Sequence, residues 1–172
     1  MSDIRGGIVS VVERTHAVAA GGPVVAAHFL GRLAVFVLGE AAMVLAEADA
    51  EPRRVSVHGG AILATVSDGA RVISGGDDGK IAETDAKGES RSLASDPKHR
   101  WIDHVALGPD GAVAWSAGKS AFAQGKELRE FAAPSTVGGL AFLPKGFRLA
   151  IAHYNGASLW FPNAPQAAPE KL

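Results

Sequence analysis

The feature that most constrains this chain is a repeat, because a short apolar run that ends in glycine recurs about every forty residues. The four closing glycines are 40, 39 and 38 residues apart, and another glycine stands shortly before each run. The closing glycines are Gly39, Gly79, Gly118 and Gly156, and the preceding ones are Gly31, Gly69, Gly111 and Gly146. A fixed period of this length is typical of proteins that stack one structural unit several times.

The runs between the glycines have the character of β-strands. Runs such as 33–38, 112–116 and 148–153 are five or six residues long and rich in Val, Leu, Ile, Phe and Trp, which favours strands over helices. Asp-Gly and Asn-Gly pairs adopt the positive φ angles that tight hairpins need. We therefore expect seven glycines to mark structural turns: Gly39, Gly69, Gly79, Gly111, Gly118, Gly146 and Gly156.

Composition narrows the class of partner. A hydrophobic share of 47% and a charged share of 20% indicate a folded globular chain. A net charge of −1 provides no basic surface for nucleic acid or for an anionic membrane. Without cysteine there is no disulfide, thiolate nucleophile or cysteine-bound metal. We see no signal peptide and no apolar stretch near the roughly 18 residues of a membrane span, so a cytoplasmic location is expected.

Three stretches repeat one phrase. They are SDGARVISGGDDGKIAETD (67–85), WIDHVALGPDGAVAWSAG (101–118) and TVGGLAFLPKGFRLAIAHYNGASLW (136–160), with a weaker copy at 24–45. The phrase resembles the blade of the WD-repeat β-propeller family, whose usual wording is close to SPDGKRLASGSDDGTIRLWD. Only Asp85 matches the aspartate of the family's Trp-Asp pair, and only Trp160 matches its tryptophan.

The family also holds its blades with a hydrogen-bonded tetrad that includes a Gly-His pair before the first strand. That pair is absent in this form, although His58 and His99 lie near its place. The resemblance therefore implies that the tetrads are incomplete. We expect these blades to depend on apolar packing instead.

The resemblance implies an all-β fold, namely a β-propeller of about four blades, each a four-stranded antiparallel sheet. An N-terminal segment (1–23) and a Pro/Ala-rich tail or linker (162–172) flank the repeats at 24–161. The blades are expected at 24–58, 61–94, 102–131 and 138–161. The last blade would have three strands, because the three prolines of the tail argue against a central strand.

The segment GIVSVVE (7–13) reads as one extra strand and leaves two architectures open. It could complete the fourth blade and close a four-blade ring, or the chain could be the front half of a longer propeller. The incomplete, open ring is favoured. An open ring would expose the flank of the fourth blade, including Leu140, Phe142 and Ile151, and such a surface would seek a second copy or another half-propeller.

No catalytic or metal-binding motif is complete. The sequence Asp77-Asp78-Gly79 lacks the further ligands of a calcium loop, and His58-Gly59-Gly60 lacks the Gly-x-Ser-x-Gly partner of esterases. Asp103 and His104 fall on a predicted innermost strand and could line an axial metal site, but neighbouring blades offer no matching ligands. We therefore expect no catalytic residues, no metal and no cofactor.

One exposed cluster has the composition of a binding site. Lys98, His99, Arg100 and Trp101 fall in the connection between the second and third blades, on the face where WD-repeat proteins usually dock partners. Arg and Trp are favoured at binding hot spots. Arg53 and Arg54 form a weaker candidate. The expected function is a non-catalytic protein–protein interaction scaffold; the alternative is a propeller-type hydrolase, or a metal- or small-ligand-binding protein, with its site in the central channel.

Overall fold

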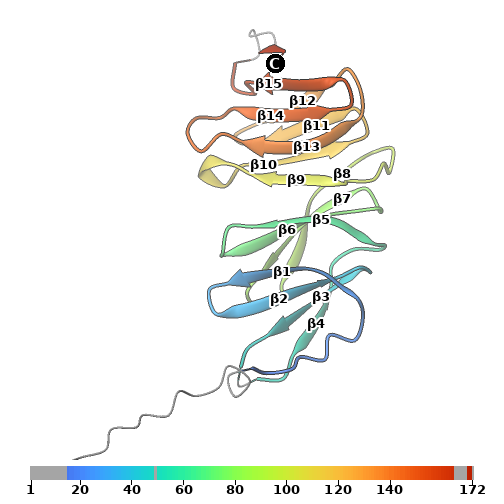
Figure 1. Cartoon of the computed structure of the whole chain (residues 1–172), viewed down its shortest axis with the longest axis vertical. Helices are drawn as coiled ribbons and strands as arrows, with labels where there is room; N and C mark the ends of the chain where they lie inside the picture. Colours follow the sequence, from blue (N-terminus) through green and yellow to red (C-terminus); the bar gives the residue numbers. More distant parts are fainter. Residues whose placement is uncertain (1–14, 49, 165–169, 172) are drawn as a thin grey trace, which may run out of the picture.

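The computed structural model describes residues 15–48, 50–164 and 170–171. These residues form four antiparallel sheets of four strands each, stacked along the long axis of the molecule (Figure 1). The stack does not close on itself. The chain is therefore an all-β, open four-blade propeller, as the repeat predicts.

The strands run in chain order within each sheet. Sheet 1 contains β1 (Val24–Leu30), β2 (Leu33–Leu38), β3 (Ala42–Ala46) and β4 (Arg53–Ser56). Sheet 2 contains β5 (Ile62–Ser67), β6 (Arg71–Gly76), β7 (Lys80–Asp85) and β8 (Ser90–Ser95). Sheet 3 contains β9 (His104–Leu107), β10 (Val113–Ala117), β11 (Ser120–Gln124) and β12 (Leu128–Ala132), with a short 3-10 turn (Pro109–Gly111) after β9. Sheet 4 contains β13 (Val137–Phe142), β14 (Leu149–His153), β15 (Gly156–Trp160) and β16 (Glu170–Lys171).

The fourth strand of sheet 4 corrects the sequence-based expectation. The short strand β16 pairs with β15, where Ser158 is opposite Lys171 and Leu159 is opposite Glu170. The prolines of the tail precede this strand and do not interrupt its ladder, and an edge strand needs partners on one side only. The segment 7–13, predicted as an extra strand, lies outside the described residues.

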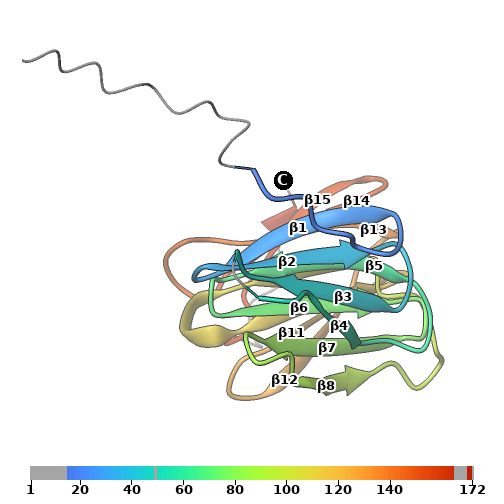
Figure 2. The same cartoon turned by 90° about the horizontal axis from the view of Figure 1, so that it is seen from below.

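The sheets fan out from their first strands. Contacts join β1 to β5, β5 to β9 and β9 to β13. Seen from below, β1, β5 and β13 lie toward one side of the molecule, and β8 and β12 lie toward the other (Figure 2). The described residues contain no helix long and apolar enough to cross a membrane.

The core lies between adjacent sheets. Sheets 1 and 2 bury Val35, Val37, Met43 and Leu45 with Ile62 and Val72. Sheets 2 and 3 bury Ile73 and Ile81 with Ile102, Val113 and Trp115. Sheets 3 and 4 bury alanines of sheet 3 under Leu149, Ile151 and Trp160. Because alternate residues of a strand point to opposite faces, each sheet inside the stack contributes to two of these layers.

The direction of sheet 4 overturns one expectation. Leu140, Phe142 and Ile151 were expected on an exposed flank, but they face sheet 3 and belong to that buried layer. The flank that sheet 4 leaves uncovered carries the alternate residues of the same strands. These are Gly139, Ala141, Ala150, Ala152, Ala157 and Leu159.

Candidate functional site

One edge of the stack gathers all the connections between sheets. We call it the loop face: it comprises the hairpin between the second and third strands of each sheet and the connections 57–61, 96–103 and 133–136 between sheets. Backbone hydrogen bonds join each connection to the hairpin of the sheet before it, as from Val57 N to Ala41 O (2.8 Å), Asp96 N to Gly79 O (2.7 Å) and Ala133 N to Lys119 O (2.8 Å). The connections are therefore held in place.

In sheet 2 a buried polar triad of hydrogen-bonded side chains links the loop-face hairpin to the connection that contains His58. The ring of His58 lies 3.0 Å from Asp78 Oδ1 through Nδ1 and 2.8 Å from Ser74 Oγ through Nε2. A carboxylate only accepts, so Nδ1–H donates to Asp78, and in the neutral ring Nε2 accepts from the Ser74 hydroxyl. These hydrogen bonds act in addition to the apolar packing on which the blades were expected to depend. The chain has His58-Gly59 where the family has Gly-His, so the triad could not be recognised from the sequence.

This triad has the connectivity of a Ser-His-Asp catalytic site, but its serine is not accessible to a substrate. The side chain of His58 is 0% exposed, and Ser74 is 0% exposed as well. A Cβ built on the adjacent Gly76 would lie only 2.5 Å from His58 Nδ1, so the surroundings leave no room for a substrate. Burial raises the pKa of Asp78, but hydrogen bonds from the Gly59 N–H and the His58 ring outweigh it, and the net pKa is lowered.

In the next connection an arginine plays a similar part by linking the connection to the hairpin of sheet 3. Arg100 donates to Asp96 Oδ1 (2.7 Å) through one terminal nitrogen and to the Ala117 carbonyl (3.0 Å) through the other. A third contact reaches Ser120 Oγ at 3.3 Å. The hydrogen bond from Arg100 lowers the pKa of the buried Asp96 to about 2. Arg100, predicted as a docking residue, is thus engaged inside the protein.

Trp101, the next residue, is 65% exposed. A tryptophan at such a place is more often expected to pack between blades than to dock a partner, and the exposure of Trp101 contradicts that expectation. Lys98 and His99 are exposed beside it, and His99 adopts a left-handed backbone with φ 51°. A second aromatic residue on the loop face, Tyr154, is 91% exposed in the hairpin of sheet 4. Its position beside Asn155-Gly156 was the available signal, and sequence reasoning did not use it.

The two other predicted basic residues, Arg53 and Arg54, lie on β4 of sheet 1. Arg53 donates to the carbonyls of Lys87 (2.6 Å) and Ala86 (3.2 Å), in the turn at the far end of β7 from the loop face. Arg54 forms an ion pair with Glu40 at 3.2 Å. The structure therefore does not bring Arg53 and Arg54 together with Trp101, and both guanidinium groups already have partners.

The predicted axial pair forms a small polar cluster. His104 Nδ1 lies 3.0 Å from Asp103 Oδ1 and 3.2 Å from Ser116 Oγ, and the Ser116 hydroxyl donates to Asp103 at 3.1 Å. The same ring nitrogen faces both partners, which is not the arrangement of a general base between an acid and a nucleophile. Within the described part of the chain, no three His, Cys, Asp or Glu side chains converge as metal ligands do.

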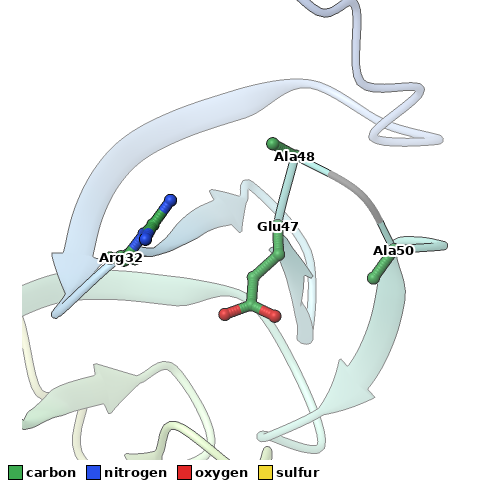
Figure 3. A pocket seen from close by; sticks show the side chains of 4 residues that line it. All are labelled: Arg32, Glu47, Ala48 and Ala50. Atoms are coloured by element: carbon green, nitrogen blue, oxygen red, sulfur yellow. The ribbon is translucent and has the colours of Figure 1, made fainter.

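A shallow depression opens beside sheet 1, away from the loop face. It measures about 430 Å³ and is lined by Arg32, Glu47, Ala48 and Ala50 (Figure 3). Its two charged side chains are exposed. Two exposed charged side chains among alanines do not form the apolar pocket with convergent polar groups that is typical of a ligand site.

The predicted turn glycines occupy hairpins at both ends of the strands. Gly69, Gly111 and Gly146 lie between the first and second strands of sheets 2, 3 and 4, and all three have positive φ. Gly79, Gly118 and Gly156 lie in or next to the hairpins of the loop face, also with positive φ. Gly39 occupies the corresponding place in sheet 1 without a positive φ, and its N–H donates to Pro23 O at 2.9 Å.

Comparison with known proteins shows likeness in structure only. No protein-family model matches the chain, and no curated protein does. The crystal structure of the computationally designed Ika4 protein superposes with a TM-score of 0.71 at 17% identity, covering 84% of this chain and 95% of that one. The fold is a β-propeller fold. A chain of the crystal structure of the mitotic checkpoint complex superposes with a TM-score of 0.68 at 18% identity over 87% of this propeller chain, which spans half of that longer chain.

Proposed function

We propose that this propeller is a non-catalytic protein-interaction scaffold of the WD-repeat type, which binds its partner through the loop face around Trp101. The observation that carries the proposal is the 65% exposure of Trp101 directly after a residue that is firmly held. Large aromatic side chains, Trp above all, are among the commonest binding hot spots. The likeness to a chain of an assembled complex is compatible with this role.

The backbone that carries Trp101 is held by the residue before it, and this supports tight binding. Arg100 is fixed by Asp96 and by the Ala117 carbonyl of the next sheet. A side chain on a fixed backbone loses less conformational entropy on binding than one on a free loop, so more of the contact energy appears as affinity. The same hydrogen bonds assign Arg100 a structural role, and the docking role belongs to Trp101.

The charges around Trp101 favour an acidic partner segment. Lys80 follows the glycine that lies against His99, Lys98 lies in the connection itself, and Lys119 lies in the hairpin that Arg100 contacts. All three are exposed, and in the described residues none of their ammonium groups forms an ion pair. Lysines on the same face as a hydrophobic anchor raise the association rate with acidic segments and make it depend on salt.

The test replaces Trp101 alone. Partners captured by the full chain through cross-linking in cells should be lost with Trp101→Ala, and the affinity for a purified partner should fall at least about tenfold, because the anchor is removed without disturbing the core. The melting temperature should stay unchanged. The matched control is Leu128→Ala on β12, which removes another side chain of 52% exposure away from the loop face. Retention of all partners by Trp101→Ala contradicts the proposal.

The hydrolase alternative has a test of its own. Because Ser74 is fully buried, a fluorophosphonate probe should leave it unmodified in the folded protein. The readout is the mass of the peptide that contains Ser74 after treatment of native protein. Stoichiometric labelling of Ser74 would show an open path to its hydroxyl and would restore the enzyme reading.

A further inference from the structure

The two ends of the stack are unlike each other. The outer face of sheet 4 is built from small side chains, because the register places Gly139, Ala152 and Ala157 in one row and Ala141, Ala150 and Leu159 in the next. Ala141 and Ala152 are exposed, and no other described element covers them. Sheet 4 lies at one end of the stack and sheet 1 at the other (Figure 1).

The molecule already shows what covers such a face. The side of sheet 3 that meets sheet 4 is also rich in alanine, with Ala106, Ala114, Ala121 and Ala123. Large side chains of sheet 4 pack against it; they are Leu140, Phe142, Leu149, Ile151 and Trp160. Faces of small and large side chains interdigitate at the roughly 10 Å spacing of stacked sheets, whereas two alanine faces would leave a gap at that spacing.

The open end of the outer face of sheet 1 carries one large, exposed side chain. Phe29 is 67% exposed and pairs with Ala34 on β2, while the partly buried Phe36 pairs with Ala27 on β1 and with Val44 on β3. Part of the face is covered, since Val18 and Ala20 of the N-terminal segment pack against the cluster of Leu38, Ala42 and Val44. The end that bears Phe29 remains open.

We propose that the outer face of sheet 4 docks on the outer face of sheet 1 of a second copy of this chain. In this contact the small side chains of sheet 4 would lie against Phe29 at the open end of sheet 1, much as the alanines of sheet 3 lie beneath large side chains of sheet 4. The contact is head-to-tail, so each copy can use both ends of its stack. The copies close into a ring when the rotation between neighbouring copies permits. This interface is separate from the loop face and does not depend on the proposed function.

The test uses one substitution on each end. Phe29→Asp and Ala152→Glu each place a charge on an exposed position of one flank, so the fold should survive, which circular dichroism checks. Wild-type full-length chain should show a dimeric or larger mass by light scattering after size exclusion. Each variant alone should be monomeric, because every head-to-tail contact needs one intact face of each kind. An equal mixture of the two variants should form a one-to-one dimer, since each supplies the face that the other lacks.

Several results would overturn the proposal. A monomeric wild-type chain over a wide concentration range would mean that these flanks meet some other segment or protein. A Phe29→Asp variant that stays associated would mean that two sheet 4 faces meet each other, and the same result for Ala152→Glu would point to two sheet 1 faces. Leu128→Asp, which changes an exposed residue of β12 away from both end faces, should keep the wild-type mass; its dissociation would mean that added charge acts nonspecifically.

Discussion

Asp96 and Arg100 make the stability of the loop face depend on pH. The pKa of Asp96 falls from its ordinary value of 3.8 to about 2 because Arg100 donates to the carboxylate in the folded protein. The unfolded chain therefore takes up the proton first as the pH falls. The stabilisation is complete above about pH 5 and is lost progressively as the pH falls through 4 toward 2.

This dependence can be isolated by comparison with Asp96→Asn. We expect the substitution to lower the free energy of unfolding at neutral pH by about 2 kcal/mol, the equivalent of a shift of nearly two pKa units, and by much less near pH 2. Urea unfolding of both proteins at several pH values measures the difference, and the comparison cancels the contributions of the other carboxylates. A difference that does not change with pH would mean that the ion pair adds no stability.

The individual residues of the site could be predicted only in part. Their types and local order indicated that Trp101 lies in a connection between sheets, but they favoured packing between blades over the 65% exposure that the structure shows. They did not reveal that Arg100 is bound to Asp96, only four residues earlier, and to a carbonyl of the next sheet. The triad of His58 joins residues 16 and 20 positions away, so it follows from how the strands pair and not from a local motif.

At the level of elements, the hairpin glycines are not equivalent. Gly79 and Gly118 both have positive φ, 75° and 61°, in the loop-face hairpins of adjacent sheets. A Cβ on Gly79 would lie 2.9 Å from His99 Cα, whereas a Cβ on Gly118 would meet nothing within 4 Å. The first position therefore combines backbone strain with a clash against the neighbouring connection, and the second has backbone strain alone.

Alanine substitutions separate these two costs. Gly118→Ala should lower the free energy of unfolding by about 1 kcal/mol, as expected for a left-handed position. Gly79→Ala should lower it by about 1–3 kcal/mol more, because the backbone of the connection must shift. Thermal or urea unfolding of the two variants gives the comparison. Equal losses would show that the connection yields freely and is not held as described.

The strands themselves follow from the sequence more completely than the site does. Alternation of apolar residues between turn glycines locates β2, β10 and β14 within one residue of the predicted runs at 33–38, 112–116 and 148–153. The strand that the sequence missed, β16, has only two residues, follows a tail with three spaced prolines and shows no periodicity to detect. Its place is set by the open edge of β15, a property of the assembled sheet.

At the level of the whole molecule, the repeat predicted four stacked sheets but not which way the last one faces. Alternation shows that Leu140 and Phe142 share one side of β13. Whether that side meets the preceding sheet or the outside depends on the layer next to it, and a register shift of one residue reverses every side chain. Only the assembled stack shows that the large residues point inward and the alanines outward.

The hydrogen bonds between the loop-face hairpins and the connections before them suit a chain that is synthesised from its N-terminus. When each loop-face hairpin leaves the ribosome, the segment that precedes its sheet has already emerged: Pro23 for sheet 1, His58 for sheet 2, Arg100 for sheet 3 and Thr136 for sheet 4. A sheet can then be secured as soon as its third strand is made, and it offers its open side as a template for the next. The nascent chain is thereby able to fold co-translationally, one sheet after another, with little unpaired surface waiting for distant residues.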